Sequence, residues 1–440
     1  MEEKTISSSP DSRRFRPYPS YKDSGVEWLG KIPENWKVRP LKYIAPLITD
    51  RIDGIALEIP YVGLEHIESR TGKMVRAAEY GPSVEQVAEG LDTRFRSGDV
   101  LLGKLRPYLA KVLLSSFDGR CSSEFLVLRS GGEISPAFLG YQLLSPGFIA
   151  WINAMTYGTK MPRASPDQVM STPITIPDAD EQSAISAFLD RETAKIDALV
   201  EKKERLIELL QEKRTALITQ AVTKGLDPTV PMKDSGIEWI ERIPGSWRVC
   251  PLFTVAREKE KRNYGNQVQN VLSLSYGKII DKDVSDNFGL LPESFETYQI
   301  VSKGNIILRL TDLQNDKRSL RVGLVRHQGI ITSAYICLDF YRDIDPSYAF
   351  YLLHAYDITK VFYGLGGGVR QTMKFEDLKW LPILMPSTAE QQVIASFLDR
   401  ETAKIDALVS RIREVIVHLR EYRTALISAA VTGKIDVREA

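Results

Sequence analysis

Two stretches of the chain are predicted to be long helices from their pattern of apolar and polar positions. Each has roughly 45 residues without Pro or Gly and is rich in Ala, Glu, Lys, Arg and Leu. Asp180 and Ser387 can cap their starts, and Gly225 and Gly433 are suitable stops. In the second stretch the gaps between apolar residues alternate between three and four except across Glu401, as in the heptad seam of a coiled coil. The predicted seam residues are Leu189, Ile196, Leu199, Leu206, Leu210 and Leu217, with Lys203 and Lys213 intruding, and Leu398, Ile405, Leu408, Ile412, Val415, Leu419, Tyr422 and Leu426.

Neither stripe can remain in water, so the two helices are predicted to pair with each other. The alternative is that each helix packs only on its own domain. A parallel pair would bring the segments that precede the helices into collision, whereas an antiparallel pair separates them and relates the two halves by a pseudo-twofold axis. At about 1.5 Å per residue, about 40 paired residues would form a rod of roughly 60 Å that acts as a spacer.

The two helical stretches belong to an internal repeat. FLDRETAKIDALV occurs without substitution at Phe188–Val200 and at Phe397–Val409, 209 positions later. KDSGVEWLGKIPENWKVRPL from Lys22 likewise resembles KDSGIEWIERIPGSWRVCPL from Lys233, 211 positions later. The chain is therefore two units, in which a Trp-containing box, a block of variable sequence and a long charged helix follow one another.

The two variable blocks, Lys42–Pro177 and Phe253–Pro386, show little similarity to each other. Each contains short β-like runs, such as DVLLGKL and EFLVLRS in the first and NIILRL and AYICLDF in the second, followed by helical stretches. The predicted fold class is α+β: two globular α/β domains joined by two long antiparallel coiled-coil helices.

The composition is that of an ordinary globular protein, with 43% hydrophobic and 26% charged residues in 440. No run approaches the roughly 18 apolar residues of a membrane helix, and the N-terminus reads as a polar tail without a signal core. Cys121, Cys250 and Cys337 lie far apart, which disfavours disulfides and zinc. We expect a soluble cytoplasmic protein.

Local charge indicates a binding surface in each block. The net charge is +4 over Arg94–Lys111 and again +4 over Lys303–Arg326, at corresponding places in otherwise dissimilar sequence. Either cluster alone could be merely a solvated face. GKLRPYLAK at Gly103–Lys111, however, intersperses its cations with Gly, Pro and Tyr in a loop-like manner that suits phosphates and base edges. Two basic surfaces held apart by a rod suggest a bipartite reader of duplex DNA.

No catalytic motif stands out in the sequence. There is no GxxxxGK[ST] phosphate-binding loop, and SRTGK at Ser69–Lys73 is too short to be one. GLGGGVR at Gly364–Arg370 lacks the GxGxxG spacing and is better interpreted as a loop. There is no HExxH motif, no NPPY or DPPY box and no nuclease carboxylate–lysine cluster. The four histidines, which we expect to be structural, are scattered: His66, His327, His354 and His418.

The KDSGxEWxxxIPxxW boxes and the EQxxIxxFLDxxTxxID helices, one on each side of a variable block, strongly resemble the specificity subunits of type I restriction-modification enzymes. The resemblance covers nearly the whole chain after about residue 20. It implies a polar tail at residues 1–21, target-recognition domains at 22–178 and 233–386, and coiled-coil helices at 179–226 and 387–436.

The family's function implies a non-catalytic DNA-binding subunit, in which each recognition domain reads one half of a bipartite site. Two modification (methyltransferase) subunits would dock on the coiled coil, and restriction subunits with translocase and nuclease activity would join them. S-adenosylmethionine, ATP and Mg²⁺ are then expected in the partner subunits, and no cofactor or metal in this chain.

YGTKMPRAS at Tyr157–Ser165 and GGGVRQTM at Gly366–Met373 resemble a loop of such recognition domains that often lies on the DNA side. Arg370 or Gln371 could make bidentate hydrogen bonds to guanine or adenine. Together with the basic clusters, this gives the candidate DNA-binding residues Lys104, Arg106, Tyr108, Lys111, Lys160, Arg163, Arg309, Lys317, Arg318, Arg321, Arg370 and Gln371.

Two rival functions remain from the sequence. One is a non-enzymatic scaffold whose blocks bind proteins or small molecules, against which the paired basic clusters count. The other is a fused enzyme that combines specificity with modification, which would need methyltransferase motifs that the sequence does not show.

Overall fold

A computed structural model describes residues 15–52, 59–75, 91–158, 160–282, 294–311, 313, 320–365 and 372–438. The chain divides into two compact units. Unit 1 holds Met1–Lys203 with Arg413–Ala440, and unit 2 holds Glu204–Ile412. No helix in the described part of the chain is long and apolar enough to cross a membrane.

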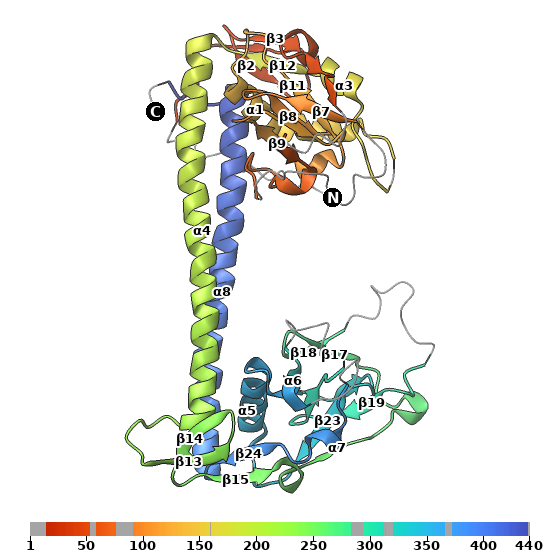
Figure 1. The fold of residues 1–440 in the computed structure, drawn as a ribbon, viewed down its shortest axis with the longest axis vertical. Helices are drawn as coiled ribbons and strands as arrows, with labels where there is room; N and C mark the ends of the chain where they lie inside the picture. Colours follow the sequence, from red (N-terminus) through yellow and green to blue (C-terminus); the bar gives the residue numbers. More distant parts are fainter. Residues whose placement is uncertain are drawn as a thin grey trace. The chain divides into compact units, whose positions relative to one another are not determined.

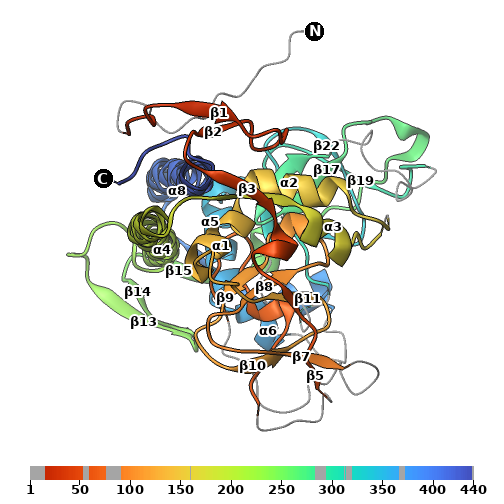
Figure 2. The same ribbon diagram turned by 90° about the horizontal axis from the view of Figure 1, so that it is seen from above.

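The two predicted long helices are present. Helix α4 spans Ala179–Lys224 and passes from unit 1 into unit 2, and helix α8 spans Thr388–Val431 and returns. In each unit the two helices therefore run antiparallel, and they lie side by side (Figures 1 and 2). Gly225 and Gly433 both follow the helix ends with positive φ, 74° and 69°, as the sequence predicted.

The N-terminal caps were predicted correctly for one helix only. The hydroxyl of Ser387 accepts a hydrogen bond from the amide of Glu390, as expected. At α4 the cap is Asp178, whose carboxylate accepts from the amide of Glu181, and the prediction of Asp180 was wrong. Asp180 already lies inside the first helical turn, where a carboxylate still favours the helix dipole.

At every second position of the coiled-coil seam, the prediction was wrong by one residue, and the residue that packs inward is the next one in the chain. Leu199, Leu206, Leu408 and Val415 are exposed, and the residue that follows each of them packs inward or is partly covered. The residues at the inward positions are Val200, Ile207, Val409 and Ile416. Because an apolar pair occupies each of these places, hydrophobicity alone could not choose between its two members.

Polar residues in the seam explain why the register was missed. Thr193 and Thr402, and likewise Arg214 and Arg423, complete the alternation of threes and fours. They are held there by hydrogen bonds and ion pairs, such as the one that joins Arg423 Nε to Asp197 Oδ1 at 2.9 Å. A search for apolar residues passes over these positions.

In unit 1 the first variable block forms two four-stranded sheets with helices on one side (Figure 1). The first sheet, in the order β5-β7-β10-β6, consists of Arg51–Ile52, Asp92–Phe95, Gly119–Cys121 and Tyr61–Val62. The second, β4-β11-β8-β9, consists of Leu47–Ile48, Phe125–Leu128, Val100–Gly103 and Val112–Leu114. The helices are α1 (Pro136–Leu144), α2 (Pro146–Ala154) and α3 (Pro166–Ser171), and short 3-10 turns are η1 (Leu41–Tyr43), η2 (Leu64–His66) and η3 (Pro107–Leu109).

Continuous apolar runs form the central strands because both faces of the second sheet are buried. In β8, Val100 and Leu102 join the core that includes the long helices, whereas Leu101 joins the core next to the other sheet. Strand β20 of unit 2 repeats this alternation, with Ile306 and Ile307 on opposite sides. Alternate side chains of a strand point to opposite faces, so a strand buried on both faces must be apolar throughout.

Unit 2 has the corresponding elements. The four-stranded sheet β16-β23-β20-β21 consists of Ala256–Glu258, Ile336–Phe340, Ile306–Leu308 and Val322–Leu324. Two-stranded sheets are β17-β18 (Leu272–Ser275, Lys278–Asp281) and β19-β22 (Gln299–Val301, Gly329–Ile331). The helices are α5 (Pro346–Ile358), α6 (Val361–Leu365) and α7 (Phe375–Leu378), and the 3-10 turns are η4 (Leu252–Thr254) and η5 (Tyr264–Asn266).

The Trp-containing boxes form the same elements in both units. Each begins with a hairpin, β1-β2 (Tyr21–Asp23, Lys31–Pro33) or β13-β14 (Met232–Ile237, Ile240–Pro244). Each then pairs with the last strand of the block, as β3-β12 (Lys37–Pro40, Pro173–Ile176) or β15-β24 (Arg248–Pro251, Pro382–Met385). Trp36 and Trp247 are completely buried at the equivalent point of each box.

The repeated Gln at the start of each long helix fastens the block to that helix. Gln182 accepts a hydrogen bond from the amide of Ser135 at 2.6 Å, and Gln391 accepts from the amide of Asp345 at 2.8 Å. Each amide group then donates to two backbone carbonyls. Ser135 and Asp345 are the residues immediately before α1 and α5, the first helix of each block. The glutamine of the repeated EQ motif therefore fixes where these two helices begin.

Candidate nucleic-acid interface

The loop Gly103–Lys111, which carries the first basic cluster, connects β8 to β9. Arg106 is exposed and has a left-handed backbone, with φ of 49°. This conformation is uncommon for a residue other than Gly and is stored strain. The 3-10 turn that follows leaves the Tyr108 ring exposed. Arg106 and Tyr108 therefore both present their side chains to solvent.

A second predicted loop, Tyr157–Arg163, lies directly against the first. The amide of Arg106 donates to the carbonyl of Pro162 at 2.7 Å, and the amide of Ala164 donates to the carbonyl of Lys104 at 2.9 Å. Tyr157 and Arg163 exchange two backbone hydrogen bonds, which close the loop. The structure thus joins two candidate segments that are about 50 residues apart in the sequence into one surface, which we call the first basic surface.

The charged side chains of this surface have few internal partners. Lys160 is exposed. The Arg163 guanidinium lies 2.8 Å from Glu124, although its side chain remains 45% exposed. Such a half-exposed ion pair contributes little to stability and can exchange its carboxylate for a phosphate.

Two apolar residues of the first basic surface were missed by sequence reasoning. Tyr157 is 60% exposed at the start of the loop, and Met161 is 53% exposed between Lys160 and Arg163. Exposed rings and thioethers can contact thymine methyl groups or stack on bases, which charge alone cannot do. The available signal was their position inside YGTKMPRAS, the segment that resembles a loop of recognition domains that often lies on the DNA side.

Lys111 has a different environment from its neighbours. Its ammonium group donates to the carbonyls of Leu64 and Ile67, at 2.5 and 2.9 Å. Burial lowers the pKa of this lysine, and the nearby Glu65 partly offsets that effect. The side chain thus holds the adjacent turn in place, and its contact with DNA stays a prediction.

The second variable block brings together the equivalent backbone segments. The amide of Met373 donates to the carbonyl of Leu310 at 2.9 Å, which corresponds to the bond between Ala164 and Lys104 in unit 1. Met373 and Ala164 are 209 positions apart, the spacing of the repeat. Of the candidates in this block, Arg309 is partly buried, and four lie outside the described residues: Lys317, Arg318, Arg370 and Gln371.

Arg321 is completely buried. Its guanidinium donates to the carbonyls of Arg309 and Thr311, at 3.1 and 2.9 Å, and to the hydroxyl of Tyr363 at 3.2 Å. A direct contact between Arg321 and DNA would require the side chain to leave this site. Its position favours support of the strand ends that carry Arg309.

Of the four histidines, His66 and His354 are buried. His66 accepts a hydrogen bond from the amide of Gly63, as a structural histidine should. His354 is buried, and neither ring nitrogen has a hydrogen-bond partner in the described part of the chain. Burial, together with the positive charge of Arg214, lowers the pKa of His354 to about 4. Among the described residues, no three His, Cys, Asp or Glu side chains gather in a way that could hold a metal ion.

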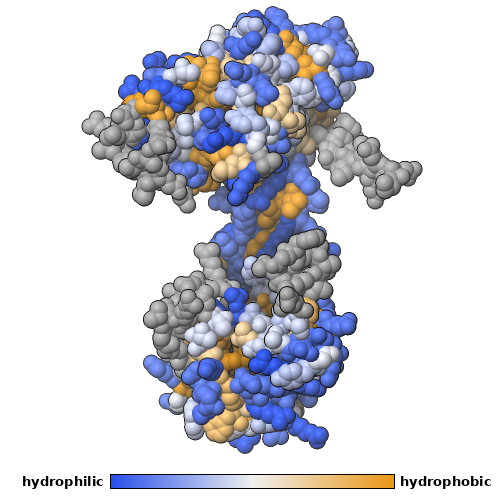
Figure 3. Space-filling model, turned by 90° about the vertical axis from the view of Figure 1, so that its right-hand side faces the viewer, coloured by the Kyte–Doolittle hydropathy of each residue, from blue (hydrophilic) through white to orange (hydrophobic). Residues whose placement is uncertain are grey.

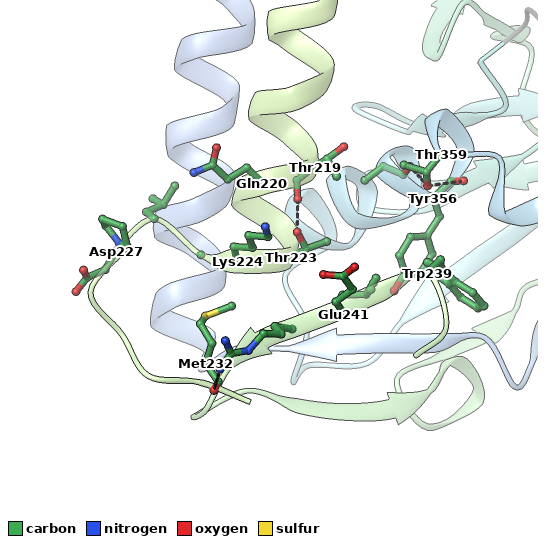
Figure 4. A pocket seen from close by; sticks show the side chains of 16 residues that line it. Thr219, Gln220, Thr223, Lys224, Asp227, Met232, Trp239, Glu241, Tyr356 and Thr359 are labelled. Carbon is green, nitrogen blue, oxygen red and sulfur yellow. Dashed lines mark hydrogen bonds between the residues drawn. The ribbon is translucent and has the colours of Figure 1, made fainter. Parts of the chain in front are cut away.

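A cavity of about 700 Å³ in unit 2 lies between the end of α4, the β13-β14 hairpin and α5 (Figure 4). Trp239 and Tyr356 form one wall, where their ring centroids are 6.1 Å apart. Lys224, Asp227 and Glu241 are charged residues of the lining (Figure 4). None of the candidate DNA-binding residues that the structure describes lines this cavity.

Comparison with known proteins agrees with this architecture. Residues 293–417 match the family model described as the type I restriction modification DNA specificity domain. The chain is 29% identical over 175 residues to the specificity subunit of the type I restriction enzyme EcoDI from Escherichia coli. That match covers 38% of this chain and spans only 38% of the length of the relative.

Solved structures share the fold at low sequence identity. A chain from a structural study of complex assembly and conformational transition of the type I R-M system superposes with a TM-score of 0.63 and 21% identity, over 91% of this chain and 98% of the other. The HsdS subunit from Thermoanaerobacter tengcongensis gives a TM-score of 0.50 and 19% identity, over 92% and 98% of the two chains.

The chain therefore has the fold of a type I restriction-modification recognition subunit. More particularly, its resemblance to the specificity subunits of these enzymes is confirmed, as is the predicted α+β fold with two long antiparallel helices. Nothing in the comparisons supports the alternative of a general scaffold.

Proposed function

We propose that this chain is the DNA-recognition subunit of a type I restriction-modification complex, and that each variable block reads one half of a bipartite site. The recognition domains comprise residues 22–178 and 233–386, and the helices comprise 179–226 and 387–436. The observation that carries the proposal is the first basic surface, where two loops distant in sequence meet and expose Arg106, Lys160 and Arg163 beside exposed rings. Cations fix the register on phosphates, and the neighbouring side chains read base edges.

The division of work with partner subunits follows from the same reading. The chain itself would transfer no methyl group and cut no DNA. Two methyltransferase subunits would bind S-adenosylmethionine, and restriction subunits would use ATP and Mg²⁺. We call the repeated parts of the chain, which are the Trp-containing boxes and the long helices, the frame. Its duplication is then explained, because two copies of one partner need two equivalent docking sites.

Exposed leucines on the helices support such docking sites. Leu199 and Leu408 hold the same position in the two identical segments, and they are 41% and 45% exposed. On the face drawn in Figure 3, hydrophobic side chains interrupt the otherwise hydrophilic surface of the helix pair. An apolar residue that is left uncovered at both copies of a repeat favours a partner that binds twice.

Site mapping tests the proposed function. The chain is assembled with the methyltransferase subunits of its own system, and the methylated DNA sites are mapped. We expect two short specific runs separated by several unread base pairs. Arg106→Ala should weaken binding by about 1–3 kcal/mol and relax one position if Arg106 reads a base, or weaken all sequences alike and flatten the salt dependence if it contacts a phosphate.

Arg205→Ala is the matched control, because Arg205 is an exposed cation outside both variable blocks that pairs with Glu208. It should leave the site and the affinity unchanged. An assembled complex that methylates a continuous site, or that binds DNA without any dependence on salt, would contradict the proposal.

A further inference from the structure

Each unit contains an ion pair between the two long helices at repeated positions. In unit 1, Arg423 Nε lies 2.9 Å from Asp197 Oδ1. In unit 2, Arg214 Nε lies 3.5 Å from Asp406 Oδ1. The two aspartates occupy the same place in FLDRETAKIDALV, and the two arginines begin the repeated RTALI segment.

A lysine from each variable block joins this pair. Lys73 Nζ lies 2.7 Å from Asp197 Oδ2, and Lys278 Nζ lies 3.0 Å from Asp406 Oδ2. Both lysines follow a glycine with a positive φ, 79° at Gly72 and 75° at Gly277. The blocks are otherwise dissimilar, so the recurrence of a Gly-Lys turn on the same aspartate is a specific feature of the fold. This explains the SRTGK segment, which is too short for a phosphate-binding loop.

Only glycine suits the two turns. A Cβ atom added at Gly72 would lie 3.2 Å from the Leu144 side chain, and one at Gly277 would lie 3.1 Å from that of Leu320. Both distances are tight, and the backbone is left-handed as well. The glycine lets the turn pack closely on the unit, so that the following lysine, Lys73 or Lys278, reaches the aspartate of the long helix.

In unit 1 the same turn also reaches the first basic surface. Arg423 donates to the carbonyls of Arg70 and Thr71, at 3.1 and 3.0 Å. The amide of Arg70 donates to the carbonyl of Ala110 at 3.1 Å. The guanidinium of Arg70 donates to the carbonyl of Tyr108 at 3.4 Å. An unbroken series of polar contacts therefore runs from the helix pair to the loop that presents Arg106.

We propose that these lysine–aspartate–arginine contacts are positioning elements, which fix the orientation of each recognition domain on the helix pair and, in unit 1, transmit it to the DNA-facing loop. This inference rests on the proposed function and adds residues that contact no DNA. The positioning residues are Lys73, Asp197 and Arg423 in unit 1 and Lys278, Asp406 and Arg214 in unit 2. Their loss should change the tolerated spacing between half-sites and leave the base letters unchanged.

The experiment compares Asp197→Asn with Asp406→Asn in the complex assembled with methyltransferase subunits. Because Arg423 is buried and Arg214 is not, we expect Asp197→Asn to weaken DNA binding about tenfold and to admit sites with a neighbouring spacer length. Asp406→Asn should weaken binding by about threefold or less, since the side chains of its ion pair are 22% and 42% exposed and solvent screens a partly exposed pair. Asp197→Glu retains the charge and should restore most of the affinity.

Lys73→Met is a second variant that should fold even if Asp197→Asn does not. The Lys73 side chain is 53% exposed, and its replacement leaves the Arg423–Asp197 pair intact. We expect it to broaden the spacer tolerance less than Asp197→Asn does. Wild-type affinity and spacing in both Lys73→Met and Asp197→Asn would overturn the inference.

Hydrogen exchange of the free chain separates this inference from the proposed function. In Asp197→Asn, amides at residues 69–73 and 106–111 should exchange several-fold faster, and those of α5 should not change. Unchanged exchange at 106–111 would refute the link to the DNA-facing loop whatever the complex binds. A wild-type complex that recognises no split site, with the exchange result as expected, would instead refute only the proposed function.

Discussion

The two halves of the molecule share the same Asp–Arg pair but enclose it differently. In unit 1 the Asp197 side chain is 19% exposed, and Arg423 is capped by two backbone carbonyls. In unit 2 the Asp406 side chain is 42% exposed. Asp406 and Arg214 line a cavity of about 340 Å³, together with Lys278 and His354. The duplicated frame thus fixes the points of contact, whereas each variable block decides how tightly those points are covered.

The equivalent positions Leu144 and His354 show the same contrast. Leu144 packs in the core of unit 1 below the Gly72 turn. His354 takes that place in unit 2 beneath the Gly277 turn, and it brings two nitrogen atoms that the described residues leave without partners. A buried polar group without a hydrogen bond costs free energy, so unit 2 has retained a feature that is less stable than its counterpart.

Exchange of a whole variable block is the largest change that this comparison allows. Replacing residues 41–178 with the block of a related subunit should change one half-site completely and leave the other as it was. The reason is that the frame contacts are repeated and the block interiors are not. Mapping of methylated sites is the measurement, and a chimaera in which both half-sites change would show that the halves do not read independently.

Arg321→Ala tests whether a buried cation in unit 2 has a supporting role that Arg106 in unit 1 does not. Removing the Arg321 guanidinium breaks three buried hydrogen bonds and leaves a space in the core, and we expect a loss of about 3 kcal/mol in the free energy of unfolding. Arg106→Ala should change it by less than about 0.5 kcal/mol. Urea unfolding measures both. An Arg321→Ala chain of wild-type stability that binds DNA poorly would instead place Arg321 in direct contact with DNA.

The sequence was sufficient for the frame and insufficient for the environment of single cations. The long helices and the boxes are carried by repeats and by long runs without Pro or Gly, which can be recognised in the sequence itself. Whether Arg106 is exposed and Arg321 buried depends on where carbonyls from distant segments lie, such as those of Arg309 and Thr311 around Arg321. Both residues looked alike as members of a basic cluster.

The contact between the two loops of unit 1 was predicted only in part from the sequence. GKLRPYLAK and YGTKMPRAS were each chosen as DNA-facing segments, but nothing in their sequences pairs the amide of Arg106 with the carbonyl of Pro162. That bond depends on the return of the chain after α2. Tyr157 and Met161 were missed for a related reason, because apolar residues are usually interpreted as core until their exposure is known.

His354→Leu tests the contrast at the equivalent buried positions. The pKa of His354 in the folded chain is about 4, against an ordinary value of 6.5. Between these values the unfolded chain binds a proton that the folded chain does not, so the stability of unit 2 falls as pH decreases from about 6.5 to about 4. The loss approaches about 3 kcal/mol at the acid end. His354→Leu should remove most of this loss and leave the stability at pH 8 equal or higher.

The reciprocal change, Leu144→His, is the control for that experiment. It should introduce the same fall in stability with acid into unit 1. Thermal unfolding at pH values between 4 and 8 measures both variants. If His354→Leu keeps the wild-type dependence on pH, the acid sensitivity does not arise from His354 and this explanation is wrong.

The smallest expected effects concern neighbouring residues of the helix repeat, one covered and one exposed. Val409→Ala removes apolar volume from the seam and should lower the free energy of unfolding by about 1 kcal/mol. Leu408→Ser changes a side chain that is 45% exposed and should change it by less than about 0.5 kcal/mol. Val200→Ala and Leu199→Ser repeat the comparison in unit 1, where Val200 is only partly covered and its effect should be smaller.

For binding of the methyltransferase subunit, the serine variants should have the larger effect and the valine variants the smaller one, the reverse of their effects on stability. If Leu199 and Leu408 are docking residues, their serine variants bind the subunit more weakly, whereas the valine variants bind it normally once folded. Titration of the subunit against each variant, with urea unfolding of the free chain, separates the two quantities. A Leu408→Ser chain that loses stability would place Leu408 in the seam after all. One that keeps both its stability and its full affinity for the subunit would show that the exposed stripe is not the docking surface. Because the same thirteen residues stand in both helices, each outcome has to appear in both units before it is assigned to the repeat itself.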